Sequence, residues 1–239
     1  MILKYPENKN PSEEQFNDLI LLYKQTKFEQ LIIESKILLS NYPNSSKLNN
    51  LIGVANFALK NLDEALSHYK KAITIKPDYA EAYGNIGNAL NYKGDIEGAL
   101  KSYKKSSEIK PNLSTTHYNL GNLYREKRDL NLAIQSYKKA IEITPNFAEA
   151  QNNLGICFQE IGDFKNSIAS FNLALKINPK YFEVYKNLGD VFQSMGNKEL
   201  GLQNYEKAIE NKIVNADIYL NLGKLYQEKN KNEKAIKNF

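Results

Sequence analysis

The sequence predicts an all-α fold built from repeated pairs of short helices, and a fixed period of 34 residues is the main reason. Five of the seven prolines keep this step: Pro43, Pro77, Pro111, Pro145 and Pro179. Six glycines keep it as well: Gly53, Gly87, Gly121, Gly155, Gly189 and Gly223. A period of this length is typical of repeat proteins whose units pack only on their neighbours.

Within one unit, 80–113, the apolar residues recur at helical spacing on both sides of the break "KGD". Each unit is therefore expected to hold two short helices joined by a turn. A small residue and an aromatic residue also recur in the second helix, and we expect the small ones, with the glycines, to allow close helix contact. The small column is Ala65, Ala99, Ala133, Ser167, Gly201 and Ala235, and the aromatic column is Tyr69, Tyr103, Tyr137, Phe171, Tyr205 and Phe239.

The residues that follow the prolines predict where each first helix begins. Asp78, Asn112 and Asn146 are of the types that cap helix N-termini, and an acidic residue such as Glu81 follows in the first turn of most units. The proline itself is expected to end the second helix of the preceding unit.

These columns resemble the tetratricopeptide repeat (TPR) family. In the unit 182–215 the matching residues are Tyr185, Leu188, Gly189, Phe192, Tyr205 and Ala208, whereas Gly201 and Ile213 depart from the pattern. The resemblance implies a right-handed superhelix whose first helices line a concave groove. It also implies full repeats at 46–79, 80–113, 114–147, 148–181 and 182–215.

The two ends of the chain depart from the repeat pattern. A tail is expected at 1–11 and an atypical capping repeat at 12–45, where Leu19, Leu31 and Ser35 replace the usual glycine, small residue and aromatic. A partial repeat at 216–239 stops within its second helix, and we expect this uncapped end to allow self-association.

Composition and charge set the expected class of protein. The N-terminus has no basic segment followed by an apolar run, and no stretch approaches about 18 apolar residues, so a cytoplasmic protein without a membrane partner is expected. The net charge is +5, but lysine pairs such as Lys104 and Lys105 fit a solvated helix face better than a nucleic-acid track. No nucleic-acid partner is expected.

The sequence predicts neither a catalytic site nor a metal or cofactor site. His68 and His117 are the only histidines, and neither lies near a second ligand or a nucleophile in a known pattern. Cys157 falls in an otherwise apolar column and is expected to be a core residue.

An asparagine precedes an apolar residue and a glycine in five successive units, which marks one polar stripe on the first helices. On a helical wheel this stripe lies about 100° from the centre of the buried face. An amide offers both a donor and an acceptor to an extended peptide backbone. Alternatively, each asparagine bonds only to the neighbouring unit. The candidate partner-binding residues are Asn85, Asn88, Asn119, Asn122, Asn153, Asn187 and Asn221.

The predicted function is a scaffold that binds extended segments of partner proteins in the concave groove. The asparagine units are similar to the TPR region of O-linked N-acetylglucosamine transferase, so the alternative is the substrate-recognition part of a larger glycosyltransferase or sulfotransferase whose catalytic domain is not in this chain. Eight acidic residues against three basic ones near the stripe predict a preference for neutral or basic segments. A clamp for a terminal carboxylate is not expected, because Lys186 faces Asp190 rather than an asparagine.

Overall fold

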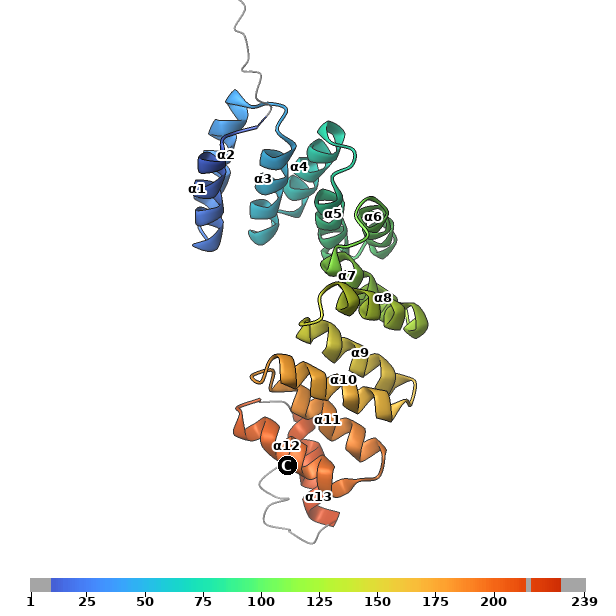
Figure 1. Cartoon of the computed structure of the whole chain (residues 1–239). Coiled ribbons are helices and arrows are strands. Elements are labelled where there is room, and N and C mark those ends of the chain that lie inside the picture. The colour runs from blue at the N-terminus through green and yellow to red at the C-terminus, as the bar shows by residue number, and fades with distance from the viewer. Residues whose placement is uncertain (1–9, 214–215, 229–239) are drawn as a thin grey trace, which may run out of the picture. The chain divides into compact units, whose positions relative to one another are not determined.

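The computed structural model describes residues 10–213 and 216–228, and every regular element in these ranges is an α-helix (Figure 1). The helices are α1 (Glu13–Lys24), α2 (Phe28–Asn41), α3 (Ser46–Ala58), α4 (Leu62–Ile75), α5 (Ala80–Tyr92), α6 (Ile96–Ile109), α7 (Ser114–Glu126), α8 (Leu130–Ile143), α9 (Ala148–Glu160), α10 (Phe164–Ile177), α11 (Glu183–Ser194), α12 (Lys198–Glu210) and α13 (Ala216–Glu228). The predicted all-α class is confirmed. The second helix expected after residue 228 lies outside the described residues.

The chain divides into two compact blocks, residues 1–120 and 121–239, with the boundary inside α7. In the first block α3 packs on α4 and α5 on α6, while α2 packs on α3 and α4 on α5. In the second block α9 packs on α10 and α11 on α12, while α8 packs on α9 and α10 on α11. Each block is therefore a stack of helix pairs, in which every second helix also contacts the next first helix.

The first helices do not begin where the sequence predicted. Pro77 and Asp78 form a turn closed by a hydrogen bond from the Tyr79 N–H to the Lys76 carbonyl (3.1 Å), so Tyr79 is the N-cap of α5 and has no side-chain cap. Phe147 is likewise the N-cap of α9. The prediction of Asp78 and Asn146 as N-caps was wrong, because proline at the second position of a turn places the following residue inside the turn.

Side-chain caps occur at α1 and α3, through Ser12 and Ser45, and at the second helices from α6 onward. Asp95, Asp129, Asp163 and Asn197 each accept a hydrogen bond from the backbone N–H three residues on. The residue two positions before each second helix has a positive φ, and it is glycine at Gly94, Gly162 and Gly196. Thr26, Lys60 and Arg128 adopt the same conformation at the equivalent position, which costs a residue with a Cβ more than it costs glycine.

The glycine column accommodates the aromatic column. A Cβ added at Gly87 would lie 2.5 Å from Cε1 of Tyr103, and the other column glycines up to Gly189 meet the equivalent ring at 2.5 to 2.7 Å. The small column instead faces the backbone of the first helix, since a Cβ at Gly201 would lie 3.5 Å from the Gly189 carbonyl oxygen. Close approach of two backbones was therefore predicted correctly for the small column, whereas the glycines make room for a ring.

The first helix pair solves the same packing problem with other residues. Leu19 and Leu31 are buried together where later units have a glycine and a small residue, and Ser35 stands where they have a ring. The two leucines occupy the volume that the missing ring leaves, which explains how a departure at three columns preserves a packed core.

Replacing Ser35 with alanine is expected to raise the free energy of unfolding by about 1 kcal/mol. The Ser35 hydroxyl is fully buried and has no hydrogen-bond partner, so folding strips it of water without compensation. Thermal unfolding would measure the gain. Ser106→Ala is the matched control, because that buried hydroxyl bonds to Thr116 at 3.0 Å, and its loss should destabilise the chain.

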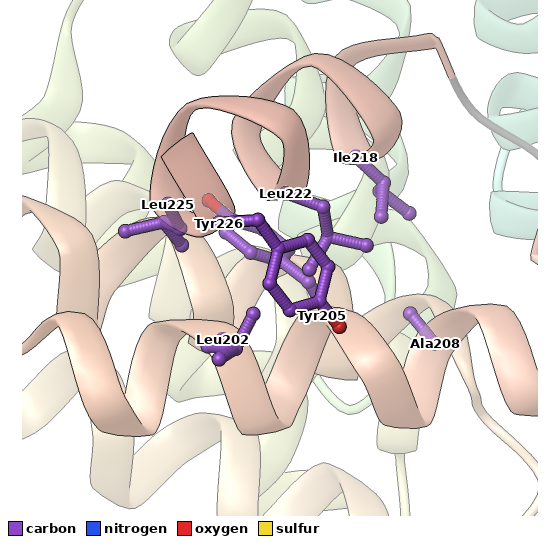
Figure 2. Packing of buried hydrophobic residues seen from close by; sticks show 7 residues of the cluster. All are labelled: Leu202, Tyr205, Ala208, Ile218, Leu222, Leu225 and Tyr226. Carbon is purple, nitrogen blue, oxygen red and sulfur yellow. The ribbon is translucent and has the colours of Figure 1, made fainter. Parts of the chain in front are cut away.

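Contact between successive units follows one pattern, which Figure 2 shows for α12 and α13. Three side chains of α12 point toward α13: Leu202, Tyr205 and Ala208. Four apolar side chains of α13 pack against them. These are Ile218, Leu222, Leu225 and Tyr226. The second helix of the preceding unit thus covers one side of each first helix, and the asparagines lie on a neighbouring, half-buried stripe.

Candidate functional site: the asparagine ladder

Each of the five recurring asparagines, called the ladder asparagines below, is half-buried and donates its side-chain amide to the preceding unit. The Nδ2 of Asn85 donates to Asn50 Oδ1 at 2.9 Å, and that of Asn119 donates to Asn88 Oδ1 at 2.9 Å. Within the second block the pairs are Asn153 with Asn122 (3.0 Å), Asn187 with Asn152 (2.9 Å) and Asn221 with the Tyr205 hydroxyl (3.1 Å). The asparagines therefore join neighbouring units.

For Asn85, Asn119, Asn153 and Asn187 the acceptor comes from one of two positions on the preceding first helix, whereas for Asn221 it is the Tyr205 hydroxyl of α12. Asn88 and Asn122 stand three residues after the ladder position of their units. Where that later position is apolar, at Val54 and Ile156, an asparagine stands one residue before the ladder position instead. Asn50 and Asn152 are these alternatives, and sequence reasoning missed both. The sequence does contain a signal for them: where the later position is apolar, the earlier position carries an asparagine.

Asn88 joins the ladder to the aromatic column. Its Oδ1 accepts a second hydrogen bond, from the buried Tyr103 hydroxyl at 2.6 Å, and Asn122 accepts one from Tyr137 at 2.7 Å. Burial raises the pKa of Tyr103, so this hydroxyl stays a proton donor at all moderate pH values. In the unit 182–215, Asp190 takes the same role toward Tyr205 at 2.7 Å.

The pairing leaves specific atoms unused. No hydrogen bond among the described residues uses the Oδ1 of Asn85, Asn119, Asn187 or Asn221, and none uses the Nδ2 of Asn88 or Asn122. The linked pair of Asn119 and Asn88 thus keeps one acceptor and one donor. An extended peptide backbone presents the complementary groups.

Ion pairs reduce the negative charge expected along the stripe. Glu81 pairs with Lys110 at 2.8 Å and Glu160 with Arg128 at 2.9 Å, while Asp190 pairs with Lys186 at 2.7 Å and Glu228 with Lys198 at 2.8 Å. Burial raises the pKa of Glu81, but the hydrogen bond and charge of Lys110 outweigh it and hold this pKa below its usual value. Four of the eight acidic residues therefore have a basic partner, and three of these partners, Lys110, Arg128 and Lys198, lie outside the count along the first helices.

Cys157 lies in the core, as predicted, and both histidines hydrogen-bond to neighbouring residues of the chain. Cys157 is fully buried, and burial raises the pKa of its thiol to about 11, so it is a poor nucleophile at neutral pH. His68 contacts Asn49 Oδ1 through Nδ1 at 3.1 Å, and His117 contacts the Pro111 carbonyl through Nε2 at 2.8 Å. In residues 10–213 and 216–228, no three His, Cys, Asp or Glu side chains gather in a way that suits a metal ion.

The lysine pairs of the second helices are exposed, as predicted. Lys105 lies 3.4 Å from Glu108, and Lys139 lies 3.0 Å from Glu142, so part of this charge is balanced locally. Over the described part of the chain, no helix combines the length and the apolar character that a membrane crossing needs.

Comparison with known proteins shows similarity along most of the chain. A family model described as TPR repeat matches residues 53–91, 87–127 and 121–162. Models described as tetratricopeptide repeat match 148–181, 182–212 and 204–237. Over 76 residues the chain is 33% identical to a probable UDP-N-acetylglucosamine–peptide N-acetylglucosaminyltransferase, SEC, of Arabidopsis thaliana. That match covers 32% of this chain and only 8% of SEC.

Solved structures with the same helix-pair architecture support the fold. MamA is 32% identical with a TM-score of 0.61, over 67% of this chain and 87% of MamA. YrrB, described as a TPR protein with an unusual peptide-binding site, is 21% identical with a TM-score of 0.63, over 74% of this chain and 91% of YrrB. With family models matching consecutive stretches from residue 53 to residue 237, the chain belongs to the tetratricopeptide repeat family.

Proposed function

We propose that the ladder face of the first helices binds extended segments of other proteins and that the chain carries out no chemistry of its own. The observation that carries this proposal is the set of unused amide atoms: Asn85, Asn119, Asn187 and Asn221 each donate Nδ2 to the preceding unit and keep Oδ1 for a ligand. Bonds to backbone atoms hold a chain without reading its side chains. YrrB, which is described as having an unusual peptide-binding site, supports the same class of ligand.

The ladder also sets the spacing of contacts. First helices stacked about 10 Å apart and a rise of about 3.3 Å per extended residue give one asparagine for about every three residues of the ligand. Neutral or basic segments are favoured over acidic ones. The preference is smaller than the count of charges suggests, because Lys110, Arg128 and Lys198, which lie outside that count, pair with acids of the face.

Peptides of about 12 residues, selected from a random library on the full chain, would test the proposal, since this length spans about four units. In the variant Asn85→Ala/Asn119→Ala, we expect the selected peptides to bind more weakly by about 1–3 kcal/mol, or about 5- to 150-fold in Kd. Fluorescence anisotropy at a temperature where circular dichroism shows every variant folded would measure it.

Asn49→Ala is the matched control. Asn49 belongs to the same block and is 2% exposed, and its side chain bonds to the Ser45 carbonyl and to His68. Its loss should lower the melting temperature without touching a ligand. Peptides that bind the ladder variant as tightly as the wild type would show that the asparagines serve only to join units.

A second candidate is the substrate-recognition part of a larger protein glycosyltransferase, and the similarity to SEC favours it. SEC is named as a peptide N-acetylglucosaminyltransferase, but this chain matches only 8% of it. Reading the natural coding sequence on both sides of residues 1–239 would decide between the two candidates, because a glycosyltransferase requires a catalytic domain outside the repeats.

A further inference from the structure

The first helix pair exposes more large apolar surface than any other pair in the described chain. Five of its large apolar side chains are exposed: Ile20, Leu21, Tyr23, Ile33 and Ile37. Leu21 is 53% exposed and Ile37 57% exposed. Both line a pocket of about 430 Å³ between α1 and α2, together with Leu22, Leu38, Asp18 and Glu34. We call this surface the end face.

Leu21 occupies a column that a helix covers in every other unit. The equivalent residues are between 0 and 2% exposed: Ala55, Ala89, Leu123, Cys157, Val191 and Leu225. Val191 packs against Phe171 and Ala174 of α10, and Leu225 packs against α12 as Figure 2 shows. In the later units, residues at the Leu21 position pack against the second helix of the preceding unit. In the end face the same position is exposed, because no helix of the described chain covers Leu21.

Charge separates the end face from the other stacking surfaces. Glu14 and Asp18 stand in the two columns that are apolar and buried at Leu48 and Ile52. Glu34 adds a third carboxylate across the pocket. None of the three acids is in an ion pair within residues 10–213 and 216–228, whereas the chain as a whole carries +5.

These charges select among the possible occupants. Two copies of the end face placed against each other would bring carboxylates together across an apolar contact, which is costly where water is excluded. A helix with basic residues beside its apolar stripe would instead pair with Asp18 and Glu34 while covering Leu21 and Ile37. Amphipathic helices that lie in apolar grooves are a recurring mode of recognition.

We propose that the end face of α1 and α2 docks one amphipathic α-helix of a partner protein, with an apolar stripe over Leu21 and Ile37 and Lys or Arg side chains against Asp18 and Glu34. This site is separate from the ladder in its residues and in its ligand, since it takes a helix rather than an extended segment.

A pair of synthetic helical peptides of about 18 residues, or five turns, tests the proposal on the full chain. Both carry the same leucine stripe, flanked by lysines in one peptide and by glutamates in the other. We expect the lysine peptide to bind more tightly in fluorescence anisotropy. Asp18→Lys/Glu34→Lys should reverse the preference, and Leu21→Ser/Ile37→Ser should weaken binding about tenfold or more.

Two controls fix the location. Ile161→Ser/Leu173→Ser removes apolar side chains that are 49% and 44% exposed elsewhere and should leave binding unchanged. Asn85→Ala/Asn119→Ala, which tests the ladder, should also leave it unchanged. Binding that survives Leu21→Ser/Ile37→Ser, or a preference that does not reverse, would overturn the proposal. So would a dimer of the wild type that Leu21→Ser/Ile37→Ser converts to monomer while neither peptide binds, because the occupant would then be a second copy.

Discussion

Replacing Gly121 with leucine is expected to lower the free energy of unfolding by about 3 kcal/mol or more. Even the first atom of a side chain does not fit: a Cβ at this position would lie 2.6 Å from Cε1 and 2.7 Å from Cδ1 of Tyr137. The ring is fully buried, and its hydroxyl donates to Asn122, so it cannot swing aside without losing that bond. Chemical denaturation of the full chain would measure the loss.

Gly84→Ala is the matched control for Gly121, because it also lies inside a first helix. A Cβ at Gly84 would meet nothing closer than 3.6 Å, so alanine should stabilise the helix by about 0.5–1 kcal/mol. A second test copies the first helix pair: leucine at residue 121 should cost less when Tyr137 is changed to serine, as Leu19 coexists with Ser35. If leucine costs the same in both backgrounds, the ring is not the obstacle.

Changing Asn88 to alanine is expected to cost about 1–3 kcal/mol of stability, most of it through Tyr103. The Asn88 side chain accepts from both the Tyr103 hydroxyl and the Asn119 amide. The amide is half-buried and can turn to water, whereas Tyr103 is only 2% exposed, so its hydroxyl would lose its partner inside the core.

A double-mutant cycle separates these two losses. Tyr103→Phe removes the stranded hydroxyl and keeps the ring, so Asn88→Ala should cost clearly less in that background than in the wild type. Equilibrium unfolding in urea gives the four free energies. Additive costs would mean that the bond between Tyr103 and Asn88 contributes nothing measurable.

The repeated columns were enough to predict the helix pairs, because the same positions are buried in each unit and therefore carry the same residue types. The wrong N-caps show where this stops. Asp78 has the composition of a cap, but whether it caps depends on the turn that Pro77 and its neighbours close, which involves the backbone of Lys76 and Tyr79. The identity of a single residue therefore cannot predict whether it caps the helix.

The candidate site was predicted only in part, for a similar reason. The sequence located the ladder asparagines on one stripe and left open whether they bond to a neighbour or to a ligand. The structure supplies the neighbour bonds, and the ligand remains a proposal. Asn50 and Asn152 were missed because they stand outside the column of the ladder asparagines, one residue before it. The acceptor alternates between this position and the position three residues after the ladder column.

This alternation limits how the repeats can be rearranged. The units 80–113 and 114–147 offer their acceptor at the same position, through Asn88 and Asn122, and so are interchangeable as neighbours of the next ladder asparagine. The units 46–79 and 148–181 offer it from the other position, through Asn50 and Asn152. The unit 182–215 supplies the Tyr205 hydroxyl instead. A duplicated or transplanted repeat in this chain therefore keeps the hydrogen bond of its ladder asparagine only if the unit before it supplies an acceptor at a matching place. The junction between two repeats, rather than the single repeat, is the part that must be copied whole.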